Sequence, residues 1–406
     1  MGKFIVNGGA SLYGGVRVSG SKNAALPMLF ASVTTFGVSR FYNLPQITDV
    51  DDALAILRGF GADIRREGSV TLIDTRTLGY VTPEADRVSR LRASTYLIGA
   101  CLARFGRAEL LSFGGCAFSH RPIDIHLSAA SDFGATLDGD NLYAEELRPA
   151  DVHLRLPSVG ATVNALILAA NTRGESRILG AATEPHIKAL ISYLISAGAR
   201  IKVADGVITV SGGELHGGSA VIPGDMIEAG TYIAASIVTG GRVRVSGFDT
   251  RELSSFTSPL LSAGVIEDVG EGSITMLGRP KREISVVTGA YPAFPTDLQP
   301  IFSTILAVSR GGRIEETVWR SRFGYLDELA RLGLSYSRED NVARIYPSSI
   351  LSGRARATDL RGGAAAILLA LSAEGESIIE NGELVLRGYD SLVTKLANLG
   401  ADIQYL

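Results

Sequence analysis

Hydrophobic and polar positions along this 406-residue chain follow one pattern that recurs six times. In each copy a two-faced helix ends at a glycine, and an alternating strand, a turn and a second strand follow. The glycines are Gly61, Gly134, Gly198, Gly264, Gly333 and Gly400, at steps of 64 to 73 residues. Glycine suits the position after a helix because the left-handed conformation there costs it little. The pattern predicts six repeats that fill the chain.

A second, nearly apolar helix opens each repeat. These helices are expected at 23–33, 93–103, 161–171, 228–238, 297–308 and 359–371. A helix that is apolar all round is buried on every side, whereas the two-faced helices at 51–59, 187–197, 326–332 and 391–399 belong outside. The clearest hairpin joins 200–204 to 207–211 through Asp205-Gly206. With a strand such as 107–113 or 242–246 after each apolar helix, the repeat reads helix, strand, helix, strand, strand.

The repeats predict an α/β protein of two domains with three repeats each. A boundary is expected near Pro223-Gly224, so that residues 22–223 form the first domain. Residues 1–21 resemble the strand-forming end of a repeat and are expected to complete the second domain with 224–406. We expect the active site in the cleft between the two domains.

Composition narrows the class of protein. Hydrophobic residues make up 46% of the chain and the net charge is -3, which indicates a globular protein without a field for nucleic acid. Only Cys101 and Cys116 occur, and the start lacks the apolar stretch of a signal peptide, so we expect a soluble, cytoplasmic protein. No apolar run is long enough for a membrane span. No spacing indicates a metal site, and no cofactor or obligate protein partner is predicted.

Polar residues gather where the apolar helices begin. Helix N-termini present unpaired N–H groups and a partial positive charge, so several that converge would bind an anion. Lys22, Arg92, Arg121 and Arg387 would add to such a site for phosphate and carboxylate groups. Ordinary helix capping is an equal alternative for Ser, Thr and Asp at any single terminus. It does not account for Lys22, which has no acceptor atom.

Cys116 stands in a Gly-Gly loop five residues before Arg121. Neighbouring cations lower the pKa of a thiol and favour its reactive thiolate form. A small buried hydrophobe is the plainer interpretation of a single cysteine, and it suits Cys101 inside an apolar helix. The glycines and basic neighbours favour a functional role for Cys116.

Six stretches together resemble the enolpyruvyl transferases, in particular the bacterial UDP-N-acetylglucosamine 1-carboxyvinyltransferases. They are residues 19–27 (SGSKNAALP), 114–126 (GGCAFSHRPIDIH), 158–162 (SVGAT), 291–299 (YPAFPTDLQ), 358–361 (TDLR) and 387–389 (RGY). The resemblance covers essentially the full length. It implies a two-domain inside-out α/β barrel of six repeats. It also implies transfer of the enolpyruvyl group of phosphoenolpyruvate to a sugar hydroxyl with release of phosphate, the first committed step of peptidoglycan precursor synthesis.

The resemblance also implies roles for individual residues. Cys116 would protonate the methylene carbon, and Asp297 would take the proton of the attacking hydroxyl. The residues implied to hold phosphoenolpyruvate are Lys22, Asn23, Arg121 and Arg387. The implied contacts of the UDP-sugar are Arg92, Arg121, Pro122, Ile123, Asp124, Ile125, Ser158, Val159, Gly160, Asp297 and Val318. Arg322, Asp359 and Arg361 would line the cleft.

Three departures bear on the acceptor. Leu156-Pro157 stand where the family usually has a Lys-Val pair, Met226 stands where it often has Arg, and Ser119-His120 replace a common Gly-Ala. Transfer to another nucleotide or sugar therefore stays open as an alternative. So does a homologue that senses a UDP-sugar without turnover. The shikimate-pathway relative fits less well because it has no loop cysteine of this kind.

Overall fold

The computed structural model describes residues 2–110, 114, 122–270 and 272–406. By their internal contacts these residues fall into two compact units. Unit 1 holds residues 2–19 and 224–406, and unit 2 holds the described part of 20–223. One crossing between the units lies at the expected Pro223-Gly224. The other lies between Ser19 and Gly20, two residues before the boundary that the repeats suggested.

Unit 2 contains three repeats. Their elements are α1 (Lys22–Ser32), β3 (Val38–Tyr42), α2 (Thr48–Gly59), β4 (Asp63–Glu67), β5 (Val70–Asp74), α3 (Ala85–Arg90), η1 (Arg92–Tyr96), α4 (Leu97–Phe105), β6 (Arg107–Glu109), α5 (Asp124–Asp132), β7 (Thr136–Asp138), β8 (Asn141–Tyr143), β9 (Asp151–His153), α6 (Val159–Asn171), β10 (Gly174–Leu179), α7 (Pro185–Ser196), β11 (Arg200–Ala204), β12 (Val207–Gly212) and β13 (Ser219–Val221). The predicted order of helix, strand, helix, strand, strand is confirmed.

Unit 1 repeats the same order. Its elements are β1 (Lys3–Gly8), β2 (Tyr13–Arg17), α8 (Met226–Thr239), β14 (Arg242–Ser246), η2 (Thr250–Leu253), α9 (Ser254–Ser262), β15 (Ile266–Gly270), β16 (Ser273–Leu277), β17 (Ile284–Val287), η3 (Thr296–Leu298), α10 (Gln299–Ala307), β18 (Gly312–Glu315), α11 (Tyr325–Ala330), β19 (Ser335–Glu339), β20 (Val342–Tyr346), β21 (Arg354–Arg356), α12 (Leu360–Ser372), β22 (Gly375–Glu380), α13 (Glu383–Leu386), α14 (Leu392–Asn398) and β23 (Asp402–Tyr405).

Five sheets have the same four-stranded plan, and β13-β3-β5-β4 is one example. The hairpin β4–β5 is antiparallel, β5 pairs antiparallel with β3, and β3 pairs parallel with the short edge strand β13. Among the described residues the remaining sheet, β6-β8-β7, has three strands. The repeat is therefore one small sheet with its helices.

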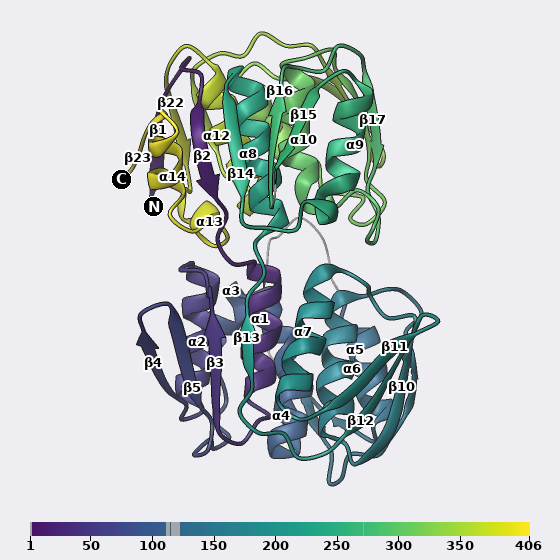
Figure 1. The fold of residues 1–406 in the computed structure, drawn as a ribbon. Helices are drawn as coiled ribbons and strands as arrows, with labels where there is room; N and C mark the ends of the chain where they lie inside the picture. The colour runs from purple at the N-terminus through teal and green to yellow at the C-terminus, as the bar shows by residue number, and fades with distance from the viewer. Residues whose placement is uncertain (1, 111–113, 115–121, 271) are drawn as a thin grey trace. The chain divides into compact units, whose positions relative to one another are not determined.

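The two ends of the chain share a sheet. Strand β1 pairs antiparallel with both β22 and β23, so the N-terminal strand supplies the second hairpin strand of the last repeat. Strand β2 pairs parallel with β14 as the edge of another sheet in unit 1. Figure 1 shows the purple N-terminal strands among the yellow and green elements. The strand-forming character of the N-terminus is thus explained.

The six glycines that define the repeat all have positive φ, between 89° and 116°. Each follows the last turn of a two-faced helix, as the sequence predicted. In the Asp205-Gly206 turn both residues also have positive φ, which matches the twist of a tight hairpin.

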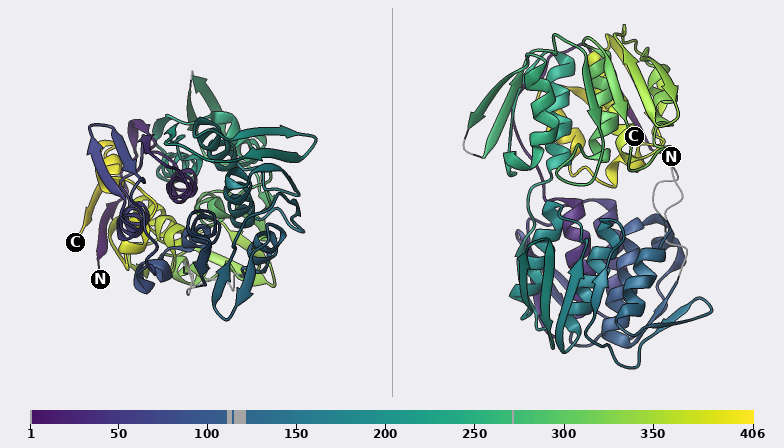
Figure 2. Two further views of the ribbon diagram at one scale, coloured as in Figure 1. Left: turned by 90° about the horizontal axis from the view of Figure 1, so that it is seen from below. Right: turned by 90° about the vertical axis from the view of Figure 1, so that its right-hand side faces the viewer.

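The apolar helices form the cores. In unit 1, α8, α10 and α12 contact one another, and every α12 residue from Leu360 to Leu371 is buried. The left-hand view of Figure 2 shows helices end-on with strands toward the periphery. Helices inside and sheets outside give the inside-out barrel that the resemblance implied. No helix in the described part of the chain is both long and apolar enough to cross a membrane.

Three elements differ from the sequence predictions. The helices expected at 93–103 and 297–308 each begin with a short 3-10 segment, η1 and η3, before the α-helix proper. The strand expected at 107–113 ends at Glu109, and residues 111–113 lie outside the described residues. Both 3-10 segments carry predicted site residues, Arg92 and Asp297.

Candidate active site

Asp297 sits between two buried arginines in unit 1. It is the second residue of η3, which begins directly after Pro295, and its side chain is 31% exposed. Its Oδ1 accepts a hydrogen bond from Arg322 Nη1 at 2.8 Å, and its Oδ2 accepts one from Arg361 Nε at 3.3 Å. The two arginine side chains are only 4% and 1% exposed. The structure thus brings three predicted residues into one cluster around a carboxylate.

Local structure fixes Arg361. It lies in the first turn of α12, where the Asp359 side chain caps the helix by accepting from the backbone N–H groups of Arg361 and Gly362 at 2.9 and 3.1 Å. The guanidinium carbon lies 5.2 Å from the centre of the Tyr389 ring, and the Tyr389 hydroxyl bonds Thr231 at 2.8 Å. These contacts hold a cation in an apolar core.

Both arginines keep their charge. Burial lowers the pKa of Arg322, but the carboxylates of Asp297 and Asp359 outweigh that effect and raise it above its usual value. Burial also lowers the pKa of Arg361, and Tyr389 and Asp297 reverse the shift. Their charges favour a charged carboxylate at Asp297, which is the form that accepts a proton.

Three residues implied to line the cleft are more deeply buried than Asp297. Arg322, Asp359 and Arg361 were expected to line a cleft, but each is buried, at 4%, 4% and 1% exposure. Val318 is 38% exposed, and Arg387 is partly buried at the end of α13. Among these residues of unit 1, Val318 is therefore exposed, and Asp297 and Arg387 are partly exposed.

A second group of predicted residues lies in unit 2 and begins with Lys22. It is the first residue of α1, and its ammonium group lies 3.1 Å from Asp49 Oδ2 in the first turn of α2. The side chains of Lys22 and Asp49 are 14% and 5% exposed. Asn23 follows on α1 and is partly buried. An ion pair, rather than a capping contact, accounts for the lysine.

Arg92, His126 and Gly160 lie close together in unit 2. Burial and, less strongly, the charge of Arg92 together lower the pKa of His126 to about 4. A Cβ atom added at Gly160 would lie 2.3 Å from His126 Nε2, so the ring packs directly on the start of α6. Ser158 caps that helix by accepting from the N–H of Ala161 at 3.3 Å, and Val159 is its first residue.

The stretch before α5 is more open. Pro122 and Asp124 are exposed, whereas Ile123 and Ile125 are partly buried. Asp124 forms an ion pair with Arg155, which directly precedes Leu156-Pro157. A cation therefore stands beside this stretch although position 156 is a leucine, itself 58% exposed.

Ordinary capping explains part of the polar pattern at the helix starts. Ser158, Asp225 and Asp359 each cap their helix with a side-chain oxygen. Ser21, Pro295 and Leu298 make no such bond. Capping therefore accounts for these three side chains, but not for Lys22, Arg92 or Asp297.

Cys116 and Arg121 lie outside the described residues. Cys101 is buried in α4, where burial raises the pKa of its thiol to about 12. That agrees with its interpretation as a small core residue. No group of three or more His, Cys, Asp and Glu side chains in the described part of the chain is placed to hold a metal ion.

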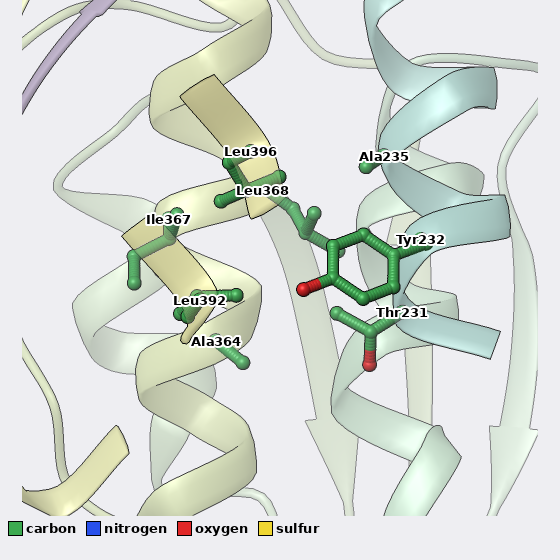
Figure 3. A pocket seen from close by; sticks show the side chains of 8 residues that line it. All are labelled: Thr231, Tyr232, Ala235, Ala364, Ile367, Leu368, Leu392 and Leu396. Atoms are coloured by element: carbon green, nitrogen blue, oxygen red, sulfur yellow. The ribbon is translucent and has the colours of Figure 1, made fainter. Parts of the chain in front are cut away.

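A small apolar pocket lies in the core of unit 1, between α8, α12 and α14 (Figure 3). Its lining residues are Thr231, Tyr232, Ala235, Ala364, Ile367, Leu368, Leu392 and Leu396. The hydroxyl of Tyr232 points toward it. None of the predicted site residues lines this pocket, so it is a feature of core packing.

Sequence reasoning missed Asp49, Glu316 and Tyr389 as members of these clusters. Asp49 looks like an ordinary acidic residue at a helix start, where the helix dipole favours one. Glu316 directly follows strand β18 and carries no motif of its own. Tyr389 belongs to a quoted motif, but its contact with Arg361 depends on tertiary packing.

The chain matches known proteins over nearly its full length. The family model of EPSP synthase (3-phosphoshikimate 1-carboxyvinyltransferase) matches residues 6–396. UDP-N-acetylglucosamine 1-carboxyvinyltransferase from Halothermothrix orenii is 38% identical over 100% of this chain and 99% of its own length. A protein of that name from Trichlorobacter lovleyi is 37% identical at the same coverage.

Solved structures give the same picture. The enolpyruvyl transferase NikO from Streptomyces tendae has a TM-score of 0.90 at 28% identity, over 100% of this chain and 99% of its own. EPSP synthase from Acinetobacter baumannii, at 17% identity and a TM-score of 0.72, shares the fold over 100% of both chains. The chain therefore belongs to the EPSP synthase family and is an enolpyruvyl (1-carboxyvinyl) transferase.

Proposed function

We propose that this protein transfers the enolpyruvyl group of phosphoenolpyruvate to the 3-hydroxyl of UDP-N-acetylglucosamine and releases phosphate. The reaction would be the first committed step of peptidoglycan precursor synthesis, in the cytoplasm. The observation that carries the proposal is the charged carboxylate of Asp297, held between Arg322 and Arg361. Relatives that are 37–38% identical over the full length and bear the name of this activity support the choice of acceptor.

The first half of the reaction is an addition to the enol double bond of phosphoenolpyruvate. Asp297 takes the proton from the acceptor hydroxyl as its oxygen bonds to C2 of phosphoenolpyruvate, and the thiol of Cys116 gives a proton to the methylene carbon. At neutral pH a carboxylate and an unperturbed thiol start in the required states. Elimination then breaks the bond from C2 to the phosphate oxygen, and loss of a proton from the former methylene carbon restores the double bond.

Cations serve the phosphate and carboxylate of phosphoenolpyruvate. We assign Lys22, Arg121 and Arg387 to them, with Asn23 beside Lys22. Fixed positive charges stabilise the charge that develops on phosphate as it leaves. The Lys22 ammonium is already held by Asp49 at 3.1 Å, so little ordering remains to be done when phosphoenolpyruvate binds.

The UDP-sugar is assigned to Arg92, the stretch from Arg121 to Ile125, the start of α6 and Val318. The cation of Arg155 beside Asp124 supports an anionic nucleotide at this stretch. His126 stays neutral at pH 7 because its pKa is lowered to about 4, so its ring packs against Gly160 without bringing a charge.

A second acceptor is worth testing because of one feature. The exposed Leu156 and Pro157 stand where the resemblance leads one to expect a Lys-Val pair. A free nucleotide or another sugar would need fewer contacts at this point. Turnover with such a nucleotide, and none with UDP-N-acetylglucosamine, would favour the alternative. Binding of the UDP-sugar without any turnover would favour a sensing homologue.

The experiment is phosphate release from phosphoenolpyruvate with UDP-N-acetylglucosamine, with and without fosfomycin, followed by mass analysis of both cysteines. We expect turnover that fosfomycin abolishes and added mass on Cys116 alone. Cys101 is the internal control, because burial and a pKa of about 12 leave it unreactive. Labelled Cys116 without turnover would contradict the proposed acceptor, and no labelling would contradict the site.

A further inference from the structure

Glu316 is a fully buried carboxylate that directly follows strand β18 in unit 1. Its Oε1 accepts hydrogen bonds from the Thr288 hydroxyl at 2.8 Å and from the backbone N–H groups of Val318 and Trp319 at 2.8 and 2.9 Å. Its Oε2 accepts one from the Thr296 hydroxyl at 2.8 Å. Four donors around one carboxylate satisfy a buried charge, which is costly to bury otherwise.

The two oxygens of Glu316 hold two different segments. Oε1 fixes the turn that carries Val318. Oε2 fixes Thr296, the neighbour of Asp297 in η3. Both segments belong to the acceptor side of the proposed reaction, Val318 as a contact of the UDP-sugar and Asp297 as the base. One buried group therefore sets the spacing between them.

Thr296 passes this orientation on to Asp297. A hydroxyl has one proton, and Thr296 gives it to Glu316, so the Thr296 oxygen meets Arg322 as an acceptor. Arg322 Nη1 donates to Thr296 Oγ1 at 3.1 Å and to Asp297 Oδ1 at 2.8 Å. A continuous chain of hydrogen bonds thus runs from Glu316 through Thr296 and Arg322 to Asp297.

We propose that Glu316 is a positioning residue for the acceptor, because its carboxylate fixes both the Val318 turn and the orientation of the Arg322–Asp297 pair. The inference rests on the proposed function, in which Asp297 and Val318 serve the acceptor sugar. Glu316 itself touches no substrate. A carboxylate that only stabilised the fold would affect both substrates alike, whereas a positioning role affects the acceptor alone.

Glu316→Gln tests the proposal with little change of shape. Three donors face Oε1, so the amide oxygen takes that place and the amide NH2 faces Thr296. The NH2 then donates to the Thr296 oxygen, and the direction of this hydrogen bond is reversed. We expect kcat to fall on the order of tenfold and KM for UDP-N-acetylglucosamine to rise severalfold. KM for phosphoenolpyruvate should stay within about twofold of wild type, because the hydrogen bonds of Glu316 lead to Val318 and Asp297, which serve the acceptor.

Thr296 provides the second test. Thr296→Val removes the hydroxyl and should reproduce the effect of Glu316→Gln, whereas Thr296→Ser keeps the hydroxyl and should restore activity. Both positions act through one chain of hydrogen bonds. The double variant E316Q/T296V should therefore be at most about twofold slower than either single variant. Multiplied losses in the double variant would overturn the proposal.

Glu315→Gln is the matched control, since Glu315 is the preceding residue and pairs with Arg313 at 2.9 Å on the outer side of β18. It should match wild type within about twofold. An E316Q variant that matches E315Q, or that raises both KM values equally, overturns the inference. If E316Q does not fold, the Thr296 variants decide. The inference is overturned if the Thr296→Ser variant is as impaired in activity as the Thr296→Val variant. No turnover by the wild-type protein overturns the proposed function and this inference together.

Discussion

Arg361 Nε lies 3.3 Å from Asp297 Oδ2, although the two residues are 64 positions apart in the sequence. With Arg322 on the other carboxylate oxygen, one partly exposed aspartate therefore faces two buried cations. The same charge thus stabilises the fold and, on the proposed mechanism, takes a proton.

Asp297→Asn should remove turnover while the protein still folds. The amide cannot accept the proton, so kcat should fall by about a hundredfold or more. Two buried arginines also lose their counter-charge, which should lower the free energy of unfolding by about 1–3 kcal/mol, less than for a fully buried pair because Asp297 is 31% exposed. Phosphate release and chemical denaturation measure the two effects. Asp268→Asn, on the exposed side of β15, should change neither. Normal kcat in the D297N variant would contradict the role of base.

Asp49→Ala should weaken the use of phosphoenolpyruvate. The alanine leaves the Lys22 ammonium without the oxygen that holds it at 3.1 Å, so KM for phosphoenolpyruvate should rise on the order of tenfold. Asp49→Asn keeps an acceptor for that ammonium group and should lie much closer to wild type. Steady-state kinetics with each substrate varied in turn measures this difference.

Asp51→Ala is the control for position 49. Asp51 lies on the same helix, is 66% exposed and pairs with Arg66 at 3.4 Å, so its loss should leave both KM values unchanged. Equal effects of the D49A and D49N variants would contradict this account. They would show that the negative charge of Asp49 matters, rather than an oxygen acceptor beside Lys22.

The sequence predicted the repeat because its signals are local. A glycine after a helix, an apolar helix and an Asp-Gly turn each depend on a few neighbouring residues, and all six glycines have the expected positive φ. Edge strands such as β9, β13 and β21 were not predicted. Each has three residues, too few for an alternating pattern, and each exists only because a neighbouring strand pairs with it.

The site was predicted residue by residue but not as clusters. Lys22 stands out in the sequence because a cation at the start of a helix is unusual, whereas Asp297 stands out only through the motif at 291–299 that carries the resemblance. Asp49 and Glu316 do not stand out, because an acidic residue at a helix start or after a strand is ordinary. Their function becomes visible only when burial is known, at 4% and 0% exposure. Burial of a single side chain is a tertiary property that no local pattern contains.

Gly160→Ala should damage the acceptor site. The added methyl group would lie 2.3 Å from His126 Nε2, and the buried ring must move to make room for it. Such overpacking should cost about 1–3 kcal/mol of stability and raise KM for UDP-N-acetylglucosamine. Gly59→Ala is the control, because nothing lies within 4 Å of its added Cβ at the end of α2. Wild-type kinetics in the G160A variant would show that the ring and this helix start do not serve the acceptor.

Glu228 gives the protein a stability that depends on pH. Its carboxylate is 2% exposed and accepts from the Lys395 ammonium at 2.6 Å and from the Ser19 N–H at 2.7 Å. Burial raises the pKa of Glu228, the Lys395 ammonium lowers it and the nearby Asp225 raises it, and the net result is a pKa of about 7. The folded protein therefore holds this proton more tightly than the unfolded chain, where a glutamate titrates at about 4.3.

The sign follows from that difference. The contribution of Glu228 to stability is fully present below about pH 4.3 and is lost as the pH rises to about 7. The glutamine of the Glu228→Gln variant cannot titrate, so this variant serves as the reference. The quantity to follow is the free energy of unfolding of the wild type minus that of the variant. It should fall by on the order of 2–3 kcal/mol between pH 4.5 and pH 7.5. Denaturant unfolding at several pH values measures this difference. Glu374→Gln, an exposed carboxylate of the same unit, should give a difference that does not change with pH. A wild-type minus E228Q difference that rises with pH would show that Lys395 outweighs burial and holds the glutamate in its charged form.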